Sequence, residues 1–329
     1  MCTALSLQTK SKETIMGRTM DFSYELDPEL YIIPKNYEWT NFYNNYKFKN
    51  QYKIMGIGQN IGKEILVDGV NEEGLGVMAL YFQGEAIYNN ITSSKEKIPV
   101  GSIELVNFLL GHCCNVDEVI DILNQINIIG VEDSITNSIA PLHWLVADKN
   151  NKCIVIEPLK DGLCIFDNPI KVLANSPRFD WHMTNLRNYM NLSLTQREQT
   201  NLDKIVLKPF GQGGGTFGMP GDYTSPSRFV RIAFQKSNTE LPINIEETII
   251  TCFNIMKTVT IPKGIVVTAK ETIDYTQYTT FITLGTGDYY FNTYYNNQVF
   301  KVNINSYDPT SIISIGKIKQ PLVIKDIYS

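Results

Sequence analysis

The second residue of the chain is a cysteine, and its place directly after the initiator methionine suggests chemistry. Methionine aminopeptidase removes Met1 when the next side chain is small, so we expect the mature chain to begin at Cys2. That residue would carry a thiol, whose ionised form is a nucleophile, and a free α-amine, whose ordinary pKa of about 7.7–8.0 suits a base. A single residue would then supply nucleophile and base, as in enzymes with an N-terminal threonine. From position alone, Cys2 could also be an exposed cysteine without a role.

The segment "GRTMDF" adds two charged residues, Arg18 and Asp21, to an otherwise apolar run. The runs "CTALSLQT" and "ETIMGRTMDF" are separated by the polar "KSK", which predicts a β-hairpin. A turn there brings residues 17–21 alongside residues 2–5, where the arginine could stabilise a thiolate and the carboxylate could orient the amine. Buried charges need partners, and these two residues could also simply pair with each other.

The elements that must position these residues follow one order along the chain: strands, two helices, strands, two helices, strands. Apolar residues at helical spacing predict helices within 100–114, 115–129, 180–190, 227–237 and 244–259. The strands cluster into hairpins, as in "EILVDGVNEEGLGVMALYF", so the sheets should be antiparallel. Two antiparallel sheets covered by helices on the outside fit this order. We expect one α+β domain over residues 1–329.

Composition excludes several classes of protein. The chain is 43% hydrophobic and 19% charged, with a net charge of −5, which is typical of a globular protein and argues against nucleic acid binding. No segment approaches the roughly 20 apolar residues that span a bilayer, and no secretory leader is apparent. The sequence therefore predicts a cytoplasmic protein without a membrane or nucleic acid partner.

Cysteine and glycine motifs have plainer interpretations. Cys113 and Cys114 follow a histidine, but no second ligand pair stands at zinc spacing, so we predict no metal. No C-x-x-C motif supports a thiol oxidoreductase, and the internal cysteines lack a papain-like setting. The glycine-rich "GQGGGTFGMPGD" (211–222) matches a dinucleotide motif only formally, because Pro220 prevents a helix from starting there. It predicts a tightly turning loop near a site.

The histidines also suggest structural roles. His143, in "LHW", lies within an apolar strand pattern and is expected to be a satisfied core residue. His182, in "FDWH", precedes a predicted helix and is expected at the surface or an interface.

Several motifs together resemble the choloylglycine hydrolases, which include bile salt hydrolases and penicillin V acylases and belong to the N-terminal nucleophile hydrolases. The motifs occur in order along nearly the whole chain: "MCTALSLQT", "GRTMDF", "DGVNEEGLG", "LANSPRFDWH", "PFGQGGGTFGMPGDYTSPSRFVR" and "DYTQYTT". The resemblance implies a four-layer αββα sandwich that hydrolyses a linear amide with an apolar acyl group. It also implies a homotetramer and no cofactor or metal.

The resemblance assigns roles residue by residue. Cys2 would be the nucleophile and base, with Arg18 and Asp21 as its partners. Asn175, in "LANSP", would donate its side-chain amide to the oxyanion, and Arg228, in "SPSRFVR", would support the site electrostatically.

The position of Tyr81, in "ALYFQG", supplies the family's other oxyanion donor, a backbone N–H. Bile salt hydrolases typically have asparagine there, whereas penicillin V acylases of Gram-positive type have tyrosine. Tyr81 therefore favours a penicillin V acylase, which forms 6-aminopenicillanic acid and phenoxyacetate, with a bile salt hydrolase as the alternative. A non-catalytic amide- or sterol-binding relative is the third possibility. By loop position, the substrate pocket would be lined by Met20, Val67, Phe82 and Ile135.

Overall fold

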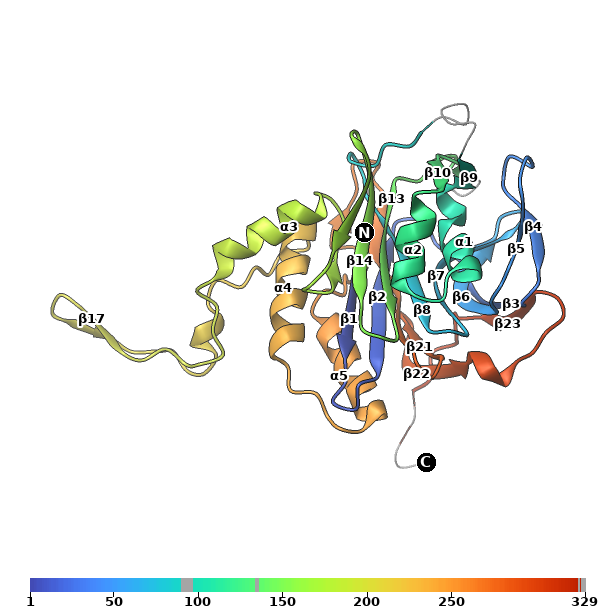
Figure 1. Cartoon of the computed structure of the whole chain (residues 1–329). Coiled ribbons are helices and arrows are strands. Elements are labelled where there is room, and N and C mark those ends of the chain that lie inside the picture. Colours follow the sequence, from blue (N-terminus) through green and yellow to red (C-terminus); the bar gives the residue numbers. More distant parts are fainter. Residues whose placement is uncertain (90–96, 134–135, 325, 327–329) are drawn as a thin grey trace.

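Two antiparallel sheets lie face to face at the centre of the molecule, with helices on their outer faces (Figure 1). The computed structural model describes all residues except 90–96, 134–135, 325 and 327–329. This arrangement confirms the expected αββα architecture, in which a layer of helices covers each side of the paired sheets.

The first sheet contains seven strands within the described residues, in the order β16-β1-β2-β20-β21-β22, with β19 paired to β20. The strands are β16 (Val172–Leu173), β1 (Cys2–Gln8), β2 (Thr14–Phe22), β20 (Ile273–Thr283), β21 (Asp288–Thr293), β22 (Asn296–Asn303) and β19 (Val266–Val267).

The predicted N-terminal hairpin is confirmed as β1 and β2. Its register places Cys2 opposite Met20 and Ala4 opposite Arg18. Both strands are central in the sheet and almost fully buried, so the first residues of the chain enter the core directly.

The second sheet contains eight strands within the described part of the chain, in the order β15-β14-β13-β8-β7-β6-β3-β23. They are β15 (Gly162–Asp167), β14 (Cys153–Leu159), β13 (Leu142–Asp148), β8 (Leu75–Tyr81), β7 (Glu64–Asn71), β6 (Ile54–Asn60), β3 (Glu29–Ile33) and β23 (Ile313–Lys317). The turn between β7 and β8 lies at the predicted "NEEG", where Gly74 has a positive φ of 87°.

Two pairs of helices cover the sheets. Helices α4 (Ser225–Asn238) and α5 (Ile245–Lys257) pack on β1 and β20 of the first sheet. Helices α1 (Leu105–His112) and α2 (Val116–Leu123) pack on β7 and β13 of the second. No helix of the described residues is long and apolar enough to cross a membrane.

Two predicted helices are shorter than expected. The helix predicted over 115–129 ends at Leu123, and Ile126–Ile129 instead form strand β10, paired in parallel with β9 (Ile98–Gly101). The run "INII" explains this difference, because β-branched residues favour a strand. The helix predicted over 180–190 is α3 (Phe179–Asn185), followed by a 3₁₀ turn over Leu186–Tyr189.

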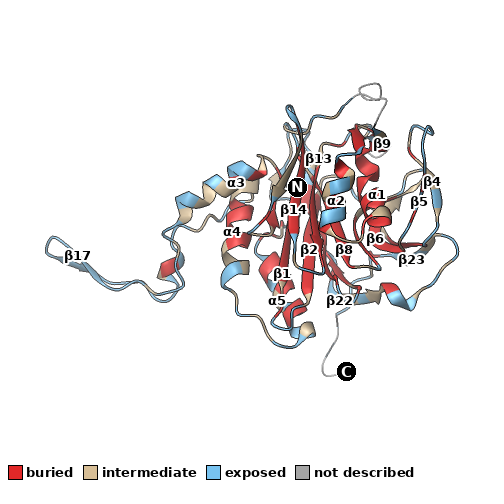
Figure 2. Ribbon diagram, viewed as in Figure 1, coloured by how far each residue is buried: buried red, intermediate tan, exposed pale blue. Residues whose placement is uncertain are grey.

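The core lies between the sheets and under both helix layers. Leu5 and Met16 of the first sheet and Met78 and Leu145 of the second belong to one fully buried cluster. Gly17 belongs to the close packing of this core, since a Cβ there would lie 2.2 Å from the ring of Phe281. Figure 2 shows the burial concentrated in the two sheets.

Several short strands form small two-stranded sheets beside the two large sheets. The hairpin of β4 (Glu38–Thr40) and β5 (Lys47–Lys49) lies outside the two large sheets, as does the antiparallel pair of β11 (Glu132–Asp133) and β12 (Ser138–Ile139).

A long connection between α3 and α4, residues 190–223, projects far from the body and is called the arm below (Figure 1). Its tip is the hairpin of β17 (Thr200–Leu202) and β18 (Ile205–Leu207), which is exposed throughout (Figure 2). The glycine-rich residues 211–222 return along the arm and contain only a 3₁₀ turn, Gly214–Thr216. The predicted loop is present, but most of it belongs to this exposed extension.

Candidate active site

The thiol of Cys2 lies at the first residue of β1 and is 3% exposed. Arg18 Nη2 on the paired strand β2 lies 2.7 Å from Cys2 Sγ. A guanidinium at this distance donates a hydrogen bond to the sulfur and stabilises its ionised form. The hairpin therefore brings together the two residues that the sequence predicted to meet.

Arg18 extends from the first sheet into the second and is itself fully buried. Its Nη1 donates to the backbone carbonyls of Ala79 and Val67, and it lies 3.9 Å from Asp68 Oδ2. Burial alone would lower the pKa of Arg18, but the negative charges of Cys2 and Asp68 outweigh burial and raise it. Arg18 thus remains a cation held between the sheets.

Asp21 lies on the same strand but has different partners. The register between β2 and β20 shifts between Met20 and Asp21, and such a bulge redirects a side chain. Asp21 Oδ1 accepts from Thr276 Oγ1 at 2.5 Å, and its Oδ2 lies 4.0 Å from Arg228 Nη1. Burial raises the pKa of this carboxyl, while the charge of Arg228 opposes the rise. Arg18 and Asp21 therefore do not simply pair with each other.

Asn175 joins the site from the segment after β16, which pairs with β1. Its Oδ1 accepts from Cys2 N at 2.7 Å, and its Nδ2 donates to the carbonyl oxygen of Tyr81 at 2.7 Å. One amide side chain thereby connects the backbone of Cys2 on the first sheet to the end of β8 on the second.

Arg228 reaches the site from the first turn of α4 and is fully buried. Its Nη1 donates to the carbonyl of Cys2 at 2.6 Å and to Thr3 Oγ1, and its Nη2 donates to Asn175 Oδ1 at 2.7 Å. The guanidinium therefore fixes the backbone of Cys2 and the side chain of Asn175 together. Burial lowers the pKa of Arg228, and the carboxylate of Asp21 opposes that shift.

The peptide group of Tyr81 faces the same site. Phe82 N donates to the carbonyl of Pro141 at 2.7 Å in the pairing with β13, and successive peptide groups of a strand point to opposite sides. The N–H and C=O of Tyr81 are therefore turned away from β13, and that C=O meets Asn175. The pairing of β8 with β7 ends at Met78, so the edge beside Tyr81 is open.

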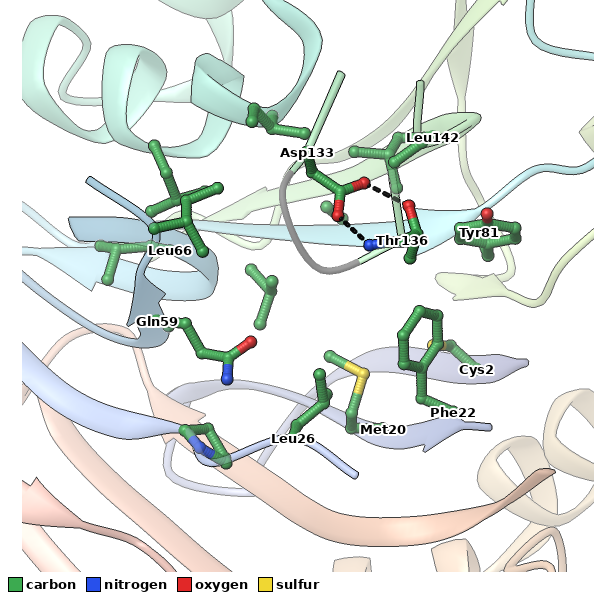
Figure 3. A pocket seen from close by; sticks show the side chains of 18 of the residues that line it. Cys2, Met20, Phe22, Leu26, Gln59, Leu66, Tyr81, Asp133, Thr136 and Leu142 are labelled. Carbon is green, nitrogen blue, oxygen red and sulfur yellow. Dashed lines mark hydrogen bonds between the residues drawn. The ribbon is translucent and has the colours of Figure 1, made fainter. Parts of the chain in front are cut away.

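A cavity of about 140 Å³ lies against Cys2. Figure 3 shows Cys2, Met20 and Phe22 together, with Gln59 and Leu66 farther along the cavity. The lining is largely apolar, which suits an apolar acyl group.

The predicted pocket residues have three outcomes. Met20 and Val67 line the cavity. Phe82 is not among the lining residues: it is fully buried with its ring stacked on His143, centroids 4.2 Å apart. Because neighbouring residues of a strand face opposite sides, Tyr81 lines the cavity and Phe82 does not. Ile135 lies outside the described residues.

Sequence reasoning missed other residues of the cavity wall, including Leu26, Leu142 and Tyr278. Tyr278 belongs to the quoted motif "DYTQYTT", and its position opposite Met20 follows from the pairing of β2 with β20. Only the pairing of strands distant in sequence could have revealed it.

The arrangement has the parts required for acyl transfer to sulfur. A thiol lies beside a fixed cation, and hydrogen-bond donors converge next to an apolar cavity. In this structure Met1 precedes Cys2, so Cys2 N is a peptide nitrogen. The ammonium of Met1 donates to the carbonyl of Asp21 at 2.5 Å and pairs with Asp274 Oδ2 at 3.1 Å. Within the described ranges, no three His, Cys, Asp or Glu side chains cluster as metal ligands.

Comparison with known proteins gives consistent results. Residues 2–311 match the model of the linear amide C-N hydrolases, choloylglycine hydrolase family. A bile salt hydrolase/transferase of Clostridium perfringens is 37% identical over 310 residues, 93% of each chain. The solved C2A mutant of the conjugated bile acid hydrolase from Clostridium perfringens superposes with a TM-score of 0.91 and 33% identity, over 99% of this chain and 100% of that one. A penicillin V acylase of Pectobacterium atrosepticum is 23% identical, over 88% of this chain and 77% of its own.

Proposed function

Because the chain belongs to the choloylglycine hydrolase family of linear amide C-N hydrolases, we propose that it hydrolyses conjugated bile salts and releases glycine or taurine. The observation that carries this proposal is the 37% identity to a bile salt hydrolase/transferase over 93% of both chains. The largely apolar lining of the cavity against Cys2 supports a substrate with an apolar acyl group.

The first step forms a bond between Cys2 Sγ and the amide carbonyl carbon. Once Met1 is removed, the free amine of Cys2 accepts the thiol proton, and the thiolate forms beside Arg18. The contact of Cys2 N with Asn175 Oδ1, 2.7 Å in this structure, then orients the amine. The carbonyl oxygen becomes an oxyanion, for which the Asn175 side chain and the Tyr81 N–H are the donors.

The second step breaks the carbon–nitrogen bond. The ammonium of Cys2 returns its proton to the leaving nitrogen, so glycine or taurine departs as a neutral amine and a thioester remains. Water then attacks the thioester carbonyl and gives its proton to the Cys2 amine. The carbon–sulfur bond breaks, the bile acid leaves, and the thiol is restored.

Penicillin V is the second candidate substrate, and Tyr81 is the observation that favours it. The Tyr81 ring lines the cavity in an edge-to-face contact with Phe22, centroids 6.0 Å apart, and these rings could contact an aromatic acyl group. On the basis of that residue, penicillin V is the first substrate expected from the sequence. The 23% identity to a penicillin V acylase, against 37% to a bile salt hydrolase/transferase, supports the opposite order.

The test compares kcat/KM of the purified mature enzyme for glycocholate, taurocholate and penicillin V. We expect kcat/KM for at least one of the two bile salts to exceed that for penicillin V by at least about tenfold. The acyl groups differ throughout, and a single methylene in an apolar pocket can already be worth about 10–200-fold. Cys2→Ala is the matched control for contaminating activity. A higher kcat/KM for penicillin V would reverse the ranking.

A further inference from the structure

Three buried polar side chains that take no part in the proposed mechanism lie behind Asn175. They are His143 on β13, Glu157 on β14 and His182 on α3, and each is fully buried. His182 was expected at the surface or an interface, and the structure corrects this. The first turn of α3 packs against the core, and the imidazole faces inward.

His182 bonds directly to the backbone of Asn175. Its Nε2 lies 2.8 Å from the Asn175 carbonyl oxygen. A carbonyl oxygen can only accept, so Nε2 carries the proton and the ring is the Nε2–H tautomer. The imidazole stacks on Phe229 of α4, with centroids 4.6 Å apart and planes at 14°. Burial lowers the pKa of His182 to about 4, so the ring stays neutral near pH 7.

A second contact anchors the other end of the same turn. Phe179 N, at the start of α3, donates to Glu157 Oε1 at 3.0 Å. The same carboxylate oxygen lies 3.1 Å from His143 Nδ1. Glu157 thus attaches the segment from Asn175 to His182 to the second sheet. The hydrogen bond from His182 to the Asn175 carbonyl joins the two ends of this segment.

These contacts matter because the Asn175 side chain is shared by the reacting parts. It touches Cys2 N, Arg228 and the carbonyl of Tyr81, each at 2.7 Å. The direction of that side chain depends on its backbone, whose carbonyl is held by His182 and by Ser225 Oγ at 2.8 Å. A rotation of this peptide would move the oxyanion donor without touching the thiol.

We propose that His182 is a positioning residue for hydrolysis: its Nε2–H fixes the Asn175 peptide so that the Asn175 amide faces the oxyanion. The inference rests on the oxyanion role that the proposed function gives Asn175. A displacement of about 1 Å in such a group can cost about 10²-fold in rate. Because Ser225 still holds the same carbonyl, we expect the loss of His182 to cost less than the loss of Asn175.

The experiment compares His182→Leu, which removes the donor, with His182→Gln, whose side-chain amide places an N–H near the same point. His112→Leu is the matched control. His112 is a half-buried histidine on α1 whose Nδ1 lies 2.8 Å from the Phe108 carbonyl of its own helix, in the other helix layer. Rates are measured on whichever of glycocholate and penicillin V the wild-type enzyme hydrolyses. A preference for penicillin V would therefore contradict the proposed substrate and leave this test intact.

We expect His182→Leu to lower kcat by about tenfold to a hundredfold, with KM within about threefold of wild type. We expect His182→Gln and His112→Leu to stay within about threefold in kcat. The alkylation rate of Cys2 by iodoacetamide should be unchanged in His182→Gln and His112→Leu. In His182→Leu it should fall far less than kcat, since the thiol and Arg18 are not altered and only the Asn175 contact to the Cys2 nitrogen is loosened. A wild-type kcat in His182→Leu would overturn the proposal. Equal losses in the Leu and Gln variants, a loss confined to KM, or a parallel fall in alkylation would do the same.

Crystal structures of the two variants test the inference without a substrate. The 2.7 Å contact between Asn175 Oδ1 and Cys2 N should persist in His182→Gln and lengthen in His182→Leu. An unmoved Asn175 in the Leu variant would contradict the positioning role even if the wild-type enzyme hydrolysed neither amide.

Discussion

Two regions of the molecule depart from the usual distribution of polar and apolar residues. The strands around Cys2 bury charged side chains, whereas the arm exposes apolar ones. On β1 and β2, the charged Arg18 and Asp21 are fully buried, and each has hydrogen-bonding partners. On the arm, Leu202 and Ile205 are 64% and 62% exposed. A core normally excludes charge, and a surface normally avoids clustered apolar residues.

The difference teaches that buried charged groups and exposed apolar groups are stabilised in different ways. Buried charge is tolerated where hydrogen bonds and opposite charges replace water, as they do for Arg18 and Arg228. The apolar residues of the arm, by contrast, are exposed among the residues that the structure describes, and an exposed apolar patch is typical of a surface that binds a second molecule. The homotetramer that the family resemblance implied stays a prediction, and the arm is the surface we expect it to use.

Among the buried polar groups, removal of the Cys2 sulfur should have the largest effect on activity. We expect Cys2→Ala to fold normally and to show no amide turnover above background, because Cys2 is the only cysteine among the described residues that line the cavity. Circular dichroism checks the fold, and release of glycine from glycocholate checks the activity. Residual turnover free of contaminating enzyme would refute Cys2 as the nucleophile.

Removing the side chain of Asn175, the proposed oxyanion donor, tests whether the buried polar groups act in catalysis. We expect Asn175→Ala to lower kcat by about 10²–10³-fold, the usual cost of one such donor. Steady-state kinetics measures it. Asn188→Ala, an exposed asparagine just after α3, is the control and should keep wild-type kcat. An Asn175→Ala variant within a few-fold of wild type would exclude the assigned role.

The pH dependence of the free energy of unfolding tests the burial of His182 as a neutral side chain. Its pKa is near 4 in the folded protein and near 6.5 when unfolded, so as pH falls the unfolded chain binds the proton first. The contribution of His182 to stability is complete above about pH 6.5 and is lost between about pH 6.5 and 4, up to about 3 kcal/mol. Urea unfolding across this range measures it. The His182→Gln variant should lose less stability over that interval, and an identical slope would contradict the assignment.

Charging the arm gives the smallest expected effect on the enzyme itself. We expect Val206→Lys to weaken self-association at least about tenfold, since burial of such a side chain is worth about 1.5–3 kcal/mol, while kcat stays within about twofold. Light scattering after gel filtration measures the mass. Ile243→Lys, at an exposed position outside the arm, is the control. Unchanged mass in Val206→Lys would show that the arm is not the contact.

The meeting of Cys2 and Arg18 could be predicted from the sequence, because a hairpin with a short turn fixes which residues face each other. Asn175 and Arg228 came only from the family resemblance, since they reach the site from distant elements through tertiary packing. His182 was misjudged because seven residues of helix reveal little about which face is buried. The sequence-based prediction placed Phe82 in the pocket, but the pocket is lined by the neighbouring Tyr81. Because side chains alternate along a strand, two consecutive residues are not expected to face the same pocket.

The register shift beside Asp21 also has a consequence for engineering. The pairing leaves Gln277 of β20 as the extra residue, and its side chain holds the carbonyls of Phe22 and Tyr24 and the amide of Leu26. Phe22 and Leu26 form part of the cavity wall. A chimera that imports the 22–28 loop of a relative should therefore import residue 277 with it. Otherwise a graft meant to change the substrate range would lose the support of its own loop.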